Sequence, residues 1–193
     1  MEGDRNVSYK GNNDWYDWTK AFIIALLLAL IVRKFFFSPI IVDGPSMQPT
    51  LYDRDQMIVN KFIYNFKEPD RFDIVIFHAS EEKDFIKRVI GLPGEHVAVR
   101  DNILYINGEE VDQPFLRHNE TTPIVYPIIT NDFSLEMLPG RHEVIPEGYV
   151  LVLGDNRSNS TDSRSIGLIS MDQIVGKTNL VYWPFERMHF VKE

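Results

Sequence analysis

The chain has 193 residues, of which 44% are hydrophobic and 25% charged, and its formal net charge is −8 at neutral pH. This length is enough for one domain with an ample hydrophobic core, or for one domain that carries a sizeable insertion. The absence of cysteine excludes disulfides, thiolate zinc sites and cysteine nucleophiles. The negative charge argues against a nucleic-acid partner, because phosphates attract clustered Lys and Arg.

The N-terminal part divides into a polar tail and an apolar helix. Residues 1–14 are polar and contain several Gly and Asn residues, so we expect a flexible tail. Ala21–Val32 is an unbroken apolar run, and the charged pair and Phe triplet that follow lengthen the predicted helix to nearly the thickness of a bilayer core. Aromatic residues typical of membrane interfaces precede the run and favour a transmembrane anchor over residues 15–37; they are Trp15, Tyr16 and Trp18.

Two alternatives to an anchor remain for this segment, a cleaved signal peptide and a buried core helix. The residues after the apolar run read RKFFFSP, which are large and charged where a signal-peptide cleavage site needs small residues. Arg and Lys occur on both sides of the run with little asymmetry. The charge pattern therefore does not decide the orientation of an anchor.

The rest of the chain is predicted to be mainly β. Pro39 is expected to end the helix, and short strands separated by turn residues follow it. Asp101-Asn102 and Asn107-Gly108 predict tight hairpin turns, and residues 112–147 are interpreted as an excursion from the main sheet. The expected strands are Ile40–Val42, Gln56–Asn60, Phe72–Phe77, Asp84–Ile90, Glu95–Arg100, one beginning at Tyr149, and Gln173–Trp183.

Ser46 is a candidate nucleophile. It lies in VDGPSMQPTL, where Gly44, Pro45 and Pro49 predict a tight turn just beyond the apolar segment that leaves the hydroxyl exposed. A serine that only satisfies local backbone groups is the alternative, because serines are common in turns.

Lys87 is a candidate general base. Strand alternation in DFIKRVIG places Phe85, Lys87 and Val89 on one face, so the amine has apolar neighbours. Desolvation disfavours an ammonium ion and lowers its pKa, and a neutral amine can take a proton from a serine hydroxyl. The alternative is a lysine on an edge strand that reaches solvent. Arg88 points to the opposite face and is interpreted as structural.

The polar loop GDNRSNSTDSRSIG, residues 154–167, is dense in acids, arginines and hydroxyls. It could orient another side chain through charge pairs and hydrogen bonds, or it could be a plain solvated loop. Ser80–Lys83 matches S-x-x-K but lacks the partner motifs of penicillin-binding enzymes, so we interpret it as an exposed loop. No G-x-S-x-G is present, which gives a Ser-His-Asp hydrolase little local support. The histidines show no metal-ligand spacing, so we expect no metal or cofactor; they are His78, His96, His118, His142 and His189.

Together the apolar segment, GPSMQPTL, RFDIVIF, KRVIGLPGE and GDNRSNSTDSR, in this order, resemble the type I signal peptidases of bacteria, a family of serine-lysine proteases. The resemblance extends from about Trp15 to Trp183 and is strongest to the Gram-positive, single-span branch. It implies a transmembrane helix followed by an antiparallel β-sheet catalytic domain of signal-peptidase type, residues 38–95 and 148–193. A smaller inserted cap-like β/loop region is expected over residues 96–147.

The resemblance also implies roles for individual residues. Ser46 matches the nucleophile, Lys87 the general base, and Ser160 the hydroxyl that hydrogen-bonds the lysine amine. Asp162 and Arg164 match a supporting charge pair.

Two positions depart from the family pattern. Gly44 stands where some members carry a serine that donates to the oxyanion hole, and Phe72 stands where many have glycine, for which we expect local repacking.

The implied activity is removal of signal peptides from exported preproteins, with cleavage after small residues at −1 and −3. The peptide is expected to add to the strands Asp73–Phe77 and Asp84–Ile86 by backbone hydrogen bonds.

The implied location is the cell membrane, with a cytoplasmic N-terminus, an extracytoplasmic catalytic domain and lipid as a partner. A secreted hydrolase and an inactive signal-peptide-binding module are the competing interpretations. The substrate-contact candidates are Ile40, Val42, Asp73, Ile76 and Ile86.

Overall fold

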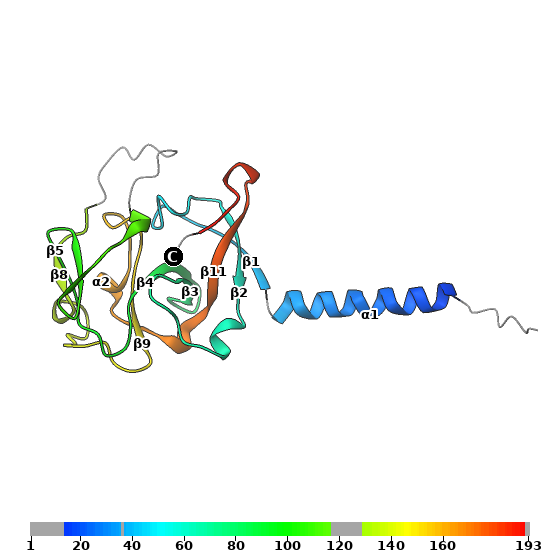
Figure 1. Ribbon diagram of the computed structural model, residues 1–193, viewed down its shortest axis with the longest axis horizontal. Coiled ribbons are helices and arrows are strands. Elements are labelled where there is room, and N and C mark those ends of the chain that lie inside the picture. Colours follow the sequence, from blue (N-terminus) through cyan, green and yellow to red (C-terminus); the bar gives the residue numbers. More distant parts are fainter. Residues whose placement is uncertain (1–13, 36, 117–128, 192–193) are drawn as a thin grey trace, which may run out of the picture.

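A computed structural model describes residues 14–35, 37–116 and 129–191. One long helix, α1 (Asp14–Phe35), projects from a body built of two β-sheets (Figure 1). Every strand pair in the described part of the chain is antiparallel. The predicted mainly-β, antiparallel architecture is therefore confirmed.

The main sheet has the strand order β1-β2-β11-β3-β4-β9-β10, with β12 paired to β11. The central strands β3, β4 and β9 are buried along most of their length and contribute side chains to one apolar core cluster, whereas β2 alternates in burial. The strands are β1 (Phe37–Ile41), β2 (Gln56–Asn60), β3 (Ile74–His78), β4 (Asp84–Gly91), β9 (Tyr149–Leu153), β10 (Ile169–Ser170), β11 (Ile174–Trp183) and β12 (His189–Phe190).

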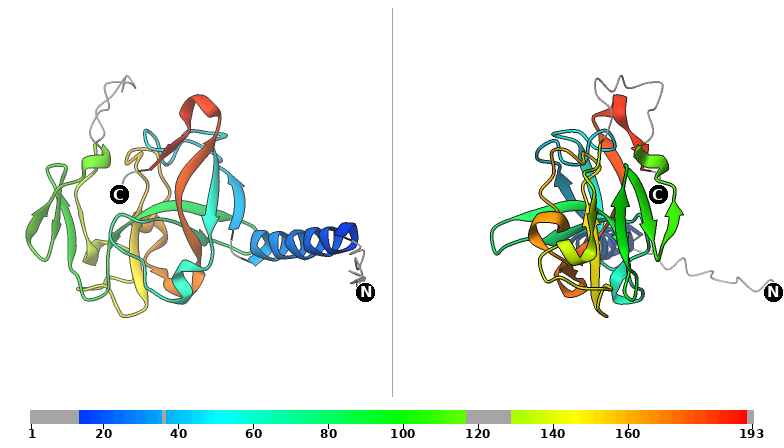
Figure 2. Two further views of the ribbon diagram at one scale, coloured as in Figure 1. Left: turned by 45° about the vertical axis from the view of Figure 1, so that its right-hand side comes forward. Right: turned by 90° about the vertical axis from the view of Figure 1, so that its left-hand side faces the viewer.

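The second sheet lies between β4 and β9 in the sequence and at the end of the body opposite to α1 (Figure 2). Its order is β7 (Glu109–Val111), β6 (Ile103–Ile106), β5 (Val97–Arg100) and β8 (Phe133–Ser134). An apolar cluster joins it to the main sheet, since side chains such as Val99 and Leu104 pack with Leu151 and Leu153. Residues 117–128 of the predicted excursion lie outside the described part.

The two predicted hairpin turns are confirmed. Asp101 and Asn102 have φ values of 49° and 66°, and Asn107 and Gly108 have 53° and 85°. These left-handed conformations match the twist of the flanking strands, and Asn, Asp and Gly adopt them most readily. The remaining short helices are α2 (Ser163–Ile166), η1 (Ile63–Asn65), η2 (Pro114–Leu116), η3 (Leu135–Met137), η4 (Met171–Gln173) and η5 (Phe185–Arg187).

The expected role of Pro39 is wrong. The helix ends at Phe35, and Pro39 lies within β1, opposite Ile58 of β2. Because β1 is the outer strand of the sheet, a residue without an N–H is tolerated there. The strand runs from Phe37 to Ile41 and so begins earlier than the expected Ile40–Val42 and leaves Val42 outside it.

Phe72 lies outside β3, and its backbone explains the glycine that many relatives are expected to carry. Its φ is +72°, a left-handed conformation that is strained for a bulky side chain. Its N–H donates to Val89 O over 2.8 Å and its ring packs edge-on against Phe115 at 5.1 Å between centroids. The departure is therefore a matter of backbone strain as well as of local repacking.

The helix α1 carries its apolar side chains on the outside. Phe22, Ile23 and Ile24 are 69%, 55% and 58% exposed, and the apolar residues that follow up to Ile31 are similarly open. Within the described residues, no helix combines the length and the apolar composition that a membrane crossing requires.

Candidate active site

Ser46 lies in the turn between β1 and β2. Gly44 begins this turn with a φ of +87°, and its N–H donates to Asp53 Oδ1. The side chains of Met47 and Leu51 on the other side of the turn are fully buried in the apolar core below it. Glycine conformation and buried anchors together hold the hydroxyl of Ser46 toward a cleft.

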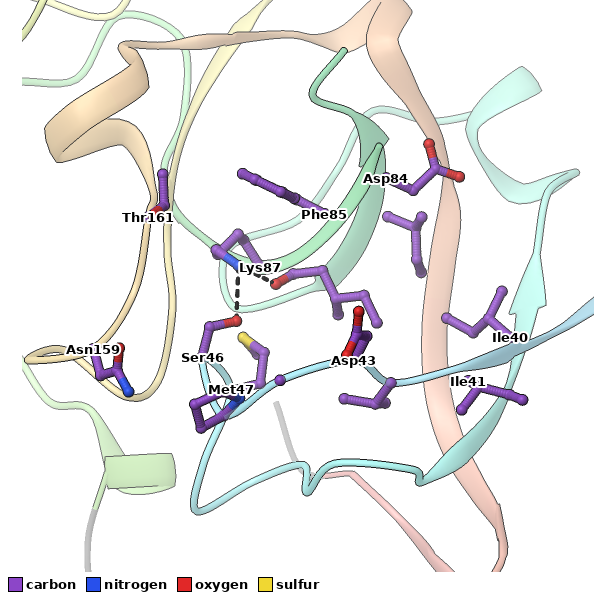
Figure 3. A pocket seen from close by; sticks show the side chains of 15 residues that line it. Ile40, Ile41, Asp43, Ser46, Met47, Asp84, Phe85, Lys87, Asn159 and Thr161 are labelled. Atoms are coloured by element: carbon purple, nitrogen blue, oxygen red, sulfur yellow. Dashed lines mark hydrogen bonds between the residues drawn. The ribbon is translucent and has the colours of Figure 1, made fainter. Parts of the chain in front are cut away.

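Lys87 brings its amine to this hydroxyl. Its Nζ lies 2.9 Å from Ser46 Oγ and donates to it, and also donates to Ile86 O at 2.9 Å (Figure 3). The residue is only 3% exposed. As strand alternation predicts, Phe85 shares the face of Lys87, and Nζ stands 5.0 Å from the centre of its ring.

The surroundings of the amine favour its neutral form. Burial lowers the pKa of Lys87 from 10.5 to about 8, and the carboxylates of Asp162 and Asp155 oppose this shift by attraction. The loss of hydration is the largest of these effects and outweighs both attractions. Both carboxylates are also paired with arginines, Asp155 with Arg88 and Asp162 with Arg164. With a pKa of about 8, about a tenth of the amine is unprotonated at pH 7, and this neutral form can accept a proton.

Asp162 and Arg164 form the pair that the resemblance implied. Arg164 Nε and Nη2 each donate to the carboxylate of Asp162 at 2.8 Å, and Asp162 is fully buried. The same carboxylate caps α2 and accepts from Gly154 N at 3.0 Å. The pair thus fixes the start and the end of the loop that faces Lys87.

Ser160 has an unusual position. Its Oγ is buried and has no hydrogen-bond partner among the described residues, so the bond to Lys87 that the resemblance implied is not formed here. A Cβ at Gly154 would lie 2.2 Å from Ser160 Oγ and 2.5 Å from Ser46 O. Gly154 therefore lets the Ser160 loop approach the turn of Ser46, a requirement that the sequence pattern alone did not single out.

Asp155 links the strand of Lys87 to the turn of Ser46. It accepts from Arg88 Nε at 2.9 Å and Nη2 at 2.8 Å, and from the hydroxyl of Thr50. Next to it, Asn156 N donates to Ser46 O over 3.0 Å. The acidic position in the loop was a visible signal, but its partner Arg88 lies 67 residues away and could not be assigned from spacing.

The cleft beside the two residues has a volume of about 520 Å³. At its apolar end it is lined by four of the predicted substrate contacts, namely Ile40, Val42, Ile76 and Ile86. The structure does not bring Asp73 to the cleft. Its carboxylate is fully buried and accepts from Tyr64 Oη at 2.8 Å and from the amine of Lys177.

The expected peptide pairing with two strands is corrected for one of them. β3 is hydrogen-bonded to β11 on one side and to β4 on the other, so neither of its edges can accept a peptide. In β4, residues Asp84–Lys87 pair only with β3, because β9 begins its pairing at Arg88. Strand patterns predict which residues are extended, but they do not show which edges are occupied.

The other patterns stay apart from the cleft. Ser80–Lys83 forms an exposed turn, closed by Ala79 N donating to Lys83 O. His118 lies outside the described residues; across the described ranges no group of three or more His, Asp or Glu side chains is arranged to hold a metal ion.

Known proteins identify the family. A family model described as "Signal peptidase, peptidase S26" matches residues 15–183. The chain is 44% identical over 167 residues to signal peptidase I of Bacillus caldolyticus, covering 86% of this chain and 91% of that protein. It is 42% identical over 186 residues to signal peptidase I T of Bacillus subtilis, covering 95% and 93%. A crystal structure of a signal peptidase I from Enterococcus faecalis is 39% identical with a TM-score of 0.50, covering 57% of this chain and 97% of that one.

The chain therefore belongs to the signal peptidase family, peptidase S26. Within it, the similarity to several signal peptidases I over most of the chain makes it an enzyme of type I, which removes signal peptides.

Proposed function

We propose that this enzyme removes signal peptides with Ser46 as the nucleophile and Lys87 as the general base. The observation that carries the proposal is the 2.9 Å contact between Lys87 Nζ and Ser46 Oγ, with the amine almost wholly removed from solvent. An exposed lysine would remain an ammonium ion and could not accept a proton.

The reaction proceeds through an acyl-enzyme. Lys87 takes the hydroxyl proton as Ser46 Oγ bonds to the scissile carbonyl carbon, and returns it to the leaving amine as the C–N bond breaks. Water then attacks the ester on Ser46 while Lys87, again neutral, takes a proton from it. As the ester C–O bond breaks, Lys87 returns this proton to Ser46 Oγ and the acyl product leaves with a free carboxyl group. The bound peptide closes the cleft and so keeps the amine dry while it works.

The tetrahedral oxyanion needs donors near Ser46. The backbone N–H of Ser46 is the first of them, since it lies at the attacking residue itself. Gly44 supplies no hydroxyl, and its conformation at φ +87° is one that a serine would adopt only with strain. The second donor is accordingly backbone or water in this enzyme.

The signal peptide binds as an added strand along Asp84–Lys87, the part of β4 whose outer edge is unpaired. Alternate side chains of an extended peptide then face the apolar end of the cleft. Ile40, Val42, Ile76 and Ile86 line this end. Branched side chains make its pockets shallow, which favours small residues at −1 and −3.

Residues 15–37 anchor the enzyme in the membrane, with the N-terminus cytoplasmic and the catalytic domain outside, where lipid is its neighbour. The exposed apolar side chains of α1 and the apolar sequence Ala21–Val32 support this placement. Membranes from expressing cells, washed with high salt, should retain the protein with Met1 or Trp15 present by mass. Release by salt, or a shortened N-terminus, would contradict the anchor.

We assign the catalytic domain to residues 38–95 and 148–193, and a cap-like insertion to residues 96–147. The support is that the second sheet interrupts the main one between β4 and β9 and shares an apolar cluster with it. Its burial against Leu151 and Leu153 couples the insertion to the strand that precedes the catalytic loop.

Cleavage of a preprotein by matched variants tests the catalytic assignment. Ser46→Ala and Lys87→Met should each lower kcat/KM by roughly 10³-fold or more, because no other described hydroxyl or amine replaces the lost group. Ser80→Ala and Lys83→Met make the same changes on an exposed turn and serve as controls. Near-normal cleavage by Ser46→Ala or Lys87→Met would refute the mechanism.

A further inference from the structure

We infer that the side chains of Asn159 and Thr161 bind the backbone of the first residues after the cleavage point, the start of the mature protein. The inference rests on the proposed function, since it takes the apolar end of the cleft for the residues before the cut. Both side chains line the cleft, on the far side of Ser46 from Ile40 and Ile41 (Figure 3). They are uncharged polar side chains on this side of Ser46, while isoleucines, together with Asp43 and Asp84, line the other side.

The sheet explains why such groups are needed there. Residues before the cut can pair with the free edge of Asp84–Lys87. Beyond Lys87 that edge is occupied, because Arg88 pairs with Leu153 of β9. A peptide running past Ser46 therefore has no strand to pair with, and its N–H and C=O groups need other partners when the cleft removes them from water.

The loop presents Asn159 and Thr161 on a fixed backbone. Asn156 N donates to Ser46 O and its side-chain amide to Pro45 O at 3.2 Å, while Asn159 N donates to Asn156 O at 3.0 Å. At the other end, Asp162 is fully buried in its pair with Arg164. The loop is thus fastened on both sides of Asn159 and Thr161, directly to the turn of the nucleophile.

The two side chains have the chemistry that a peptide backbone requires. The Asn159 amide offers a donor and an acceptor, as a neighbouring strand would, and the Thr161 hydroxyl can serve as either. Both residues are exposed, and neither side chain is hydrogen-bonded to another described residue. Their hydrogen-bonding groups are therefore open to a ligand in the cleft.

Peptide substrates with one altered backbone group test this subsite. In the wild-type enzyme, N-methylation of an amide one to three residues after the cut should lower kcat/KM by about 5-fold, the effect of one hydrogen bond. Asn159→Ala should lower kcat/KM for the unmodified peptide by a similar factor and abolish the further effect of methylation at that position. Thr161→Val tests the second side chain in the same way.

Controls separate this inference from the proposed function. Methylation of the same peptides before the cut should slow wild type and Asn159→Ala equally, and Asn179→Ala, an exposed asparagine in β11, should respond like wild type. If methylation after the cut slows both Asn159→Ala and Thr161→Val as much as wild type, the subsite is wrong, although cleavage by Ser46 and Lys87 stands. If Ser46→Ala still cleaves the unmodified peptide, the proposed function itself fails.

Discussion

Lys87 and Arg88 are neighbours in β4 whose side chains leave the strand on opposite faces, and both are buried. Lys87 is 3% exposed and meets Ser46, whereas Arg88 is fully enclosed and binds Asp155 with two nitrogen atoms. Burial lowers the pKa of Lys87, which has no carboxylate in direct contact among the described residues, while Arg88 is neutralised by its ion pair with Asp155. Strand alternation thus separates Lys87, the proposed base, from Arg88, whose charge is part of a buried ion pair.

The pH dependence of cleavage should report the amine of Lys87. In the proposed mechanism the neutral amine is the active form, so kcat/KM should rise with pH and level off above a pKa of about 8. Below that pKa, kcat/KM should fall about tenfold per pH unit. A pH-rate profile on a peptide substrate checks this. An ascending limb centred near the ordinary lysine value of 10.5, or no dependence between pH 6 and 9, would contradict a buried base.

Replacing Lys87 with Met should stabilise the fold while destroying activity. Burial lowers the pKa of Lys87 in the folded state from 10.5 to about 8, so between these values the unfolded state binds more protons and stability rises with pH. At pH 7 the charged amine therefore costs on the order of 3 kcal/mol. At pH 7 the free energy of unfolding of Lys87→Met should exceed that of wild type by up to this amount. The difference should shrink as the pH rises from about 8 to 10.5.

Urea unfolding of both proteins at several pH values measures this difference. Lys83→Met, on the exposed turn, is the control and should leave stability nearly unchanged at every pH. A Lys87→Met protein that is less stable than wild type at pH 7 would show that the amine is not held at an energetic cost.

Asp155→Asn should destabilise the enzyme by about 3 kcal/mol or more, because it leaves Arg88 buried without its counter-ion. Asp172→Asn is an exposed control with little expected effect. Thermal unfolding measures both variants. Activity should fall together with stability, because the neighbouring residue Asn156 holds Ser46 O through its backbone N–H. Equal melting temperatures for Asp155→Asn and wild type would mean that the ion pair does not stabilise this loop.

At position 72, glycine should give a more stable protein than alanine, the reverse of the usual order of these two substitutions. Both substitutions lose the packing on Phe115, but only glycine relieves the left-handed backbone at φ +72°. Phe72→Gly should therefore be about 1 kcal/mol more stable than Phe72→Ala. Phe115, which lies in η2, provides the control: Phe115→Ala should be more stable than Phe115→Gly there. The prediction fails if alanine is also preferred at position 72 in chemical unfolding.

Local patterns predicted the features that depend on neighbours in the chain. The hairpin turns at Asp101-Asn102 and Asn107-Gly108 followed from their residue types, because left-handed conformations are encoded locally. The shared face of Phe85 and Lys87 followed from strand periodicity. Pro39 was misjudged, because whether a proline breaks an element depends on whether its missing N–H was needed by a neighbouring strand.

The sequence by itself determined the family, the strand class and the pair of candidate residues, since these rest on residue types in short motifs. Only the tertiary structure decided that Ser46 and Lys87, 41 positions apart, stand in hydrogen-bond contact. It also decided that Asp73 is enclosed, that Ser160 is unpartnered and that β4 has a free edge up to Lys87. Contacts, burial and edge occupancy arise from packing between distant segments, which no local pattern contains.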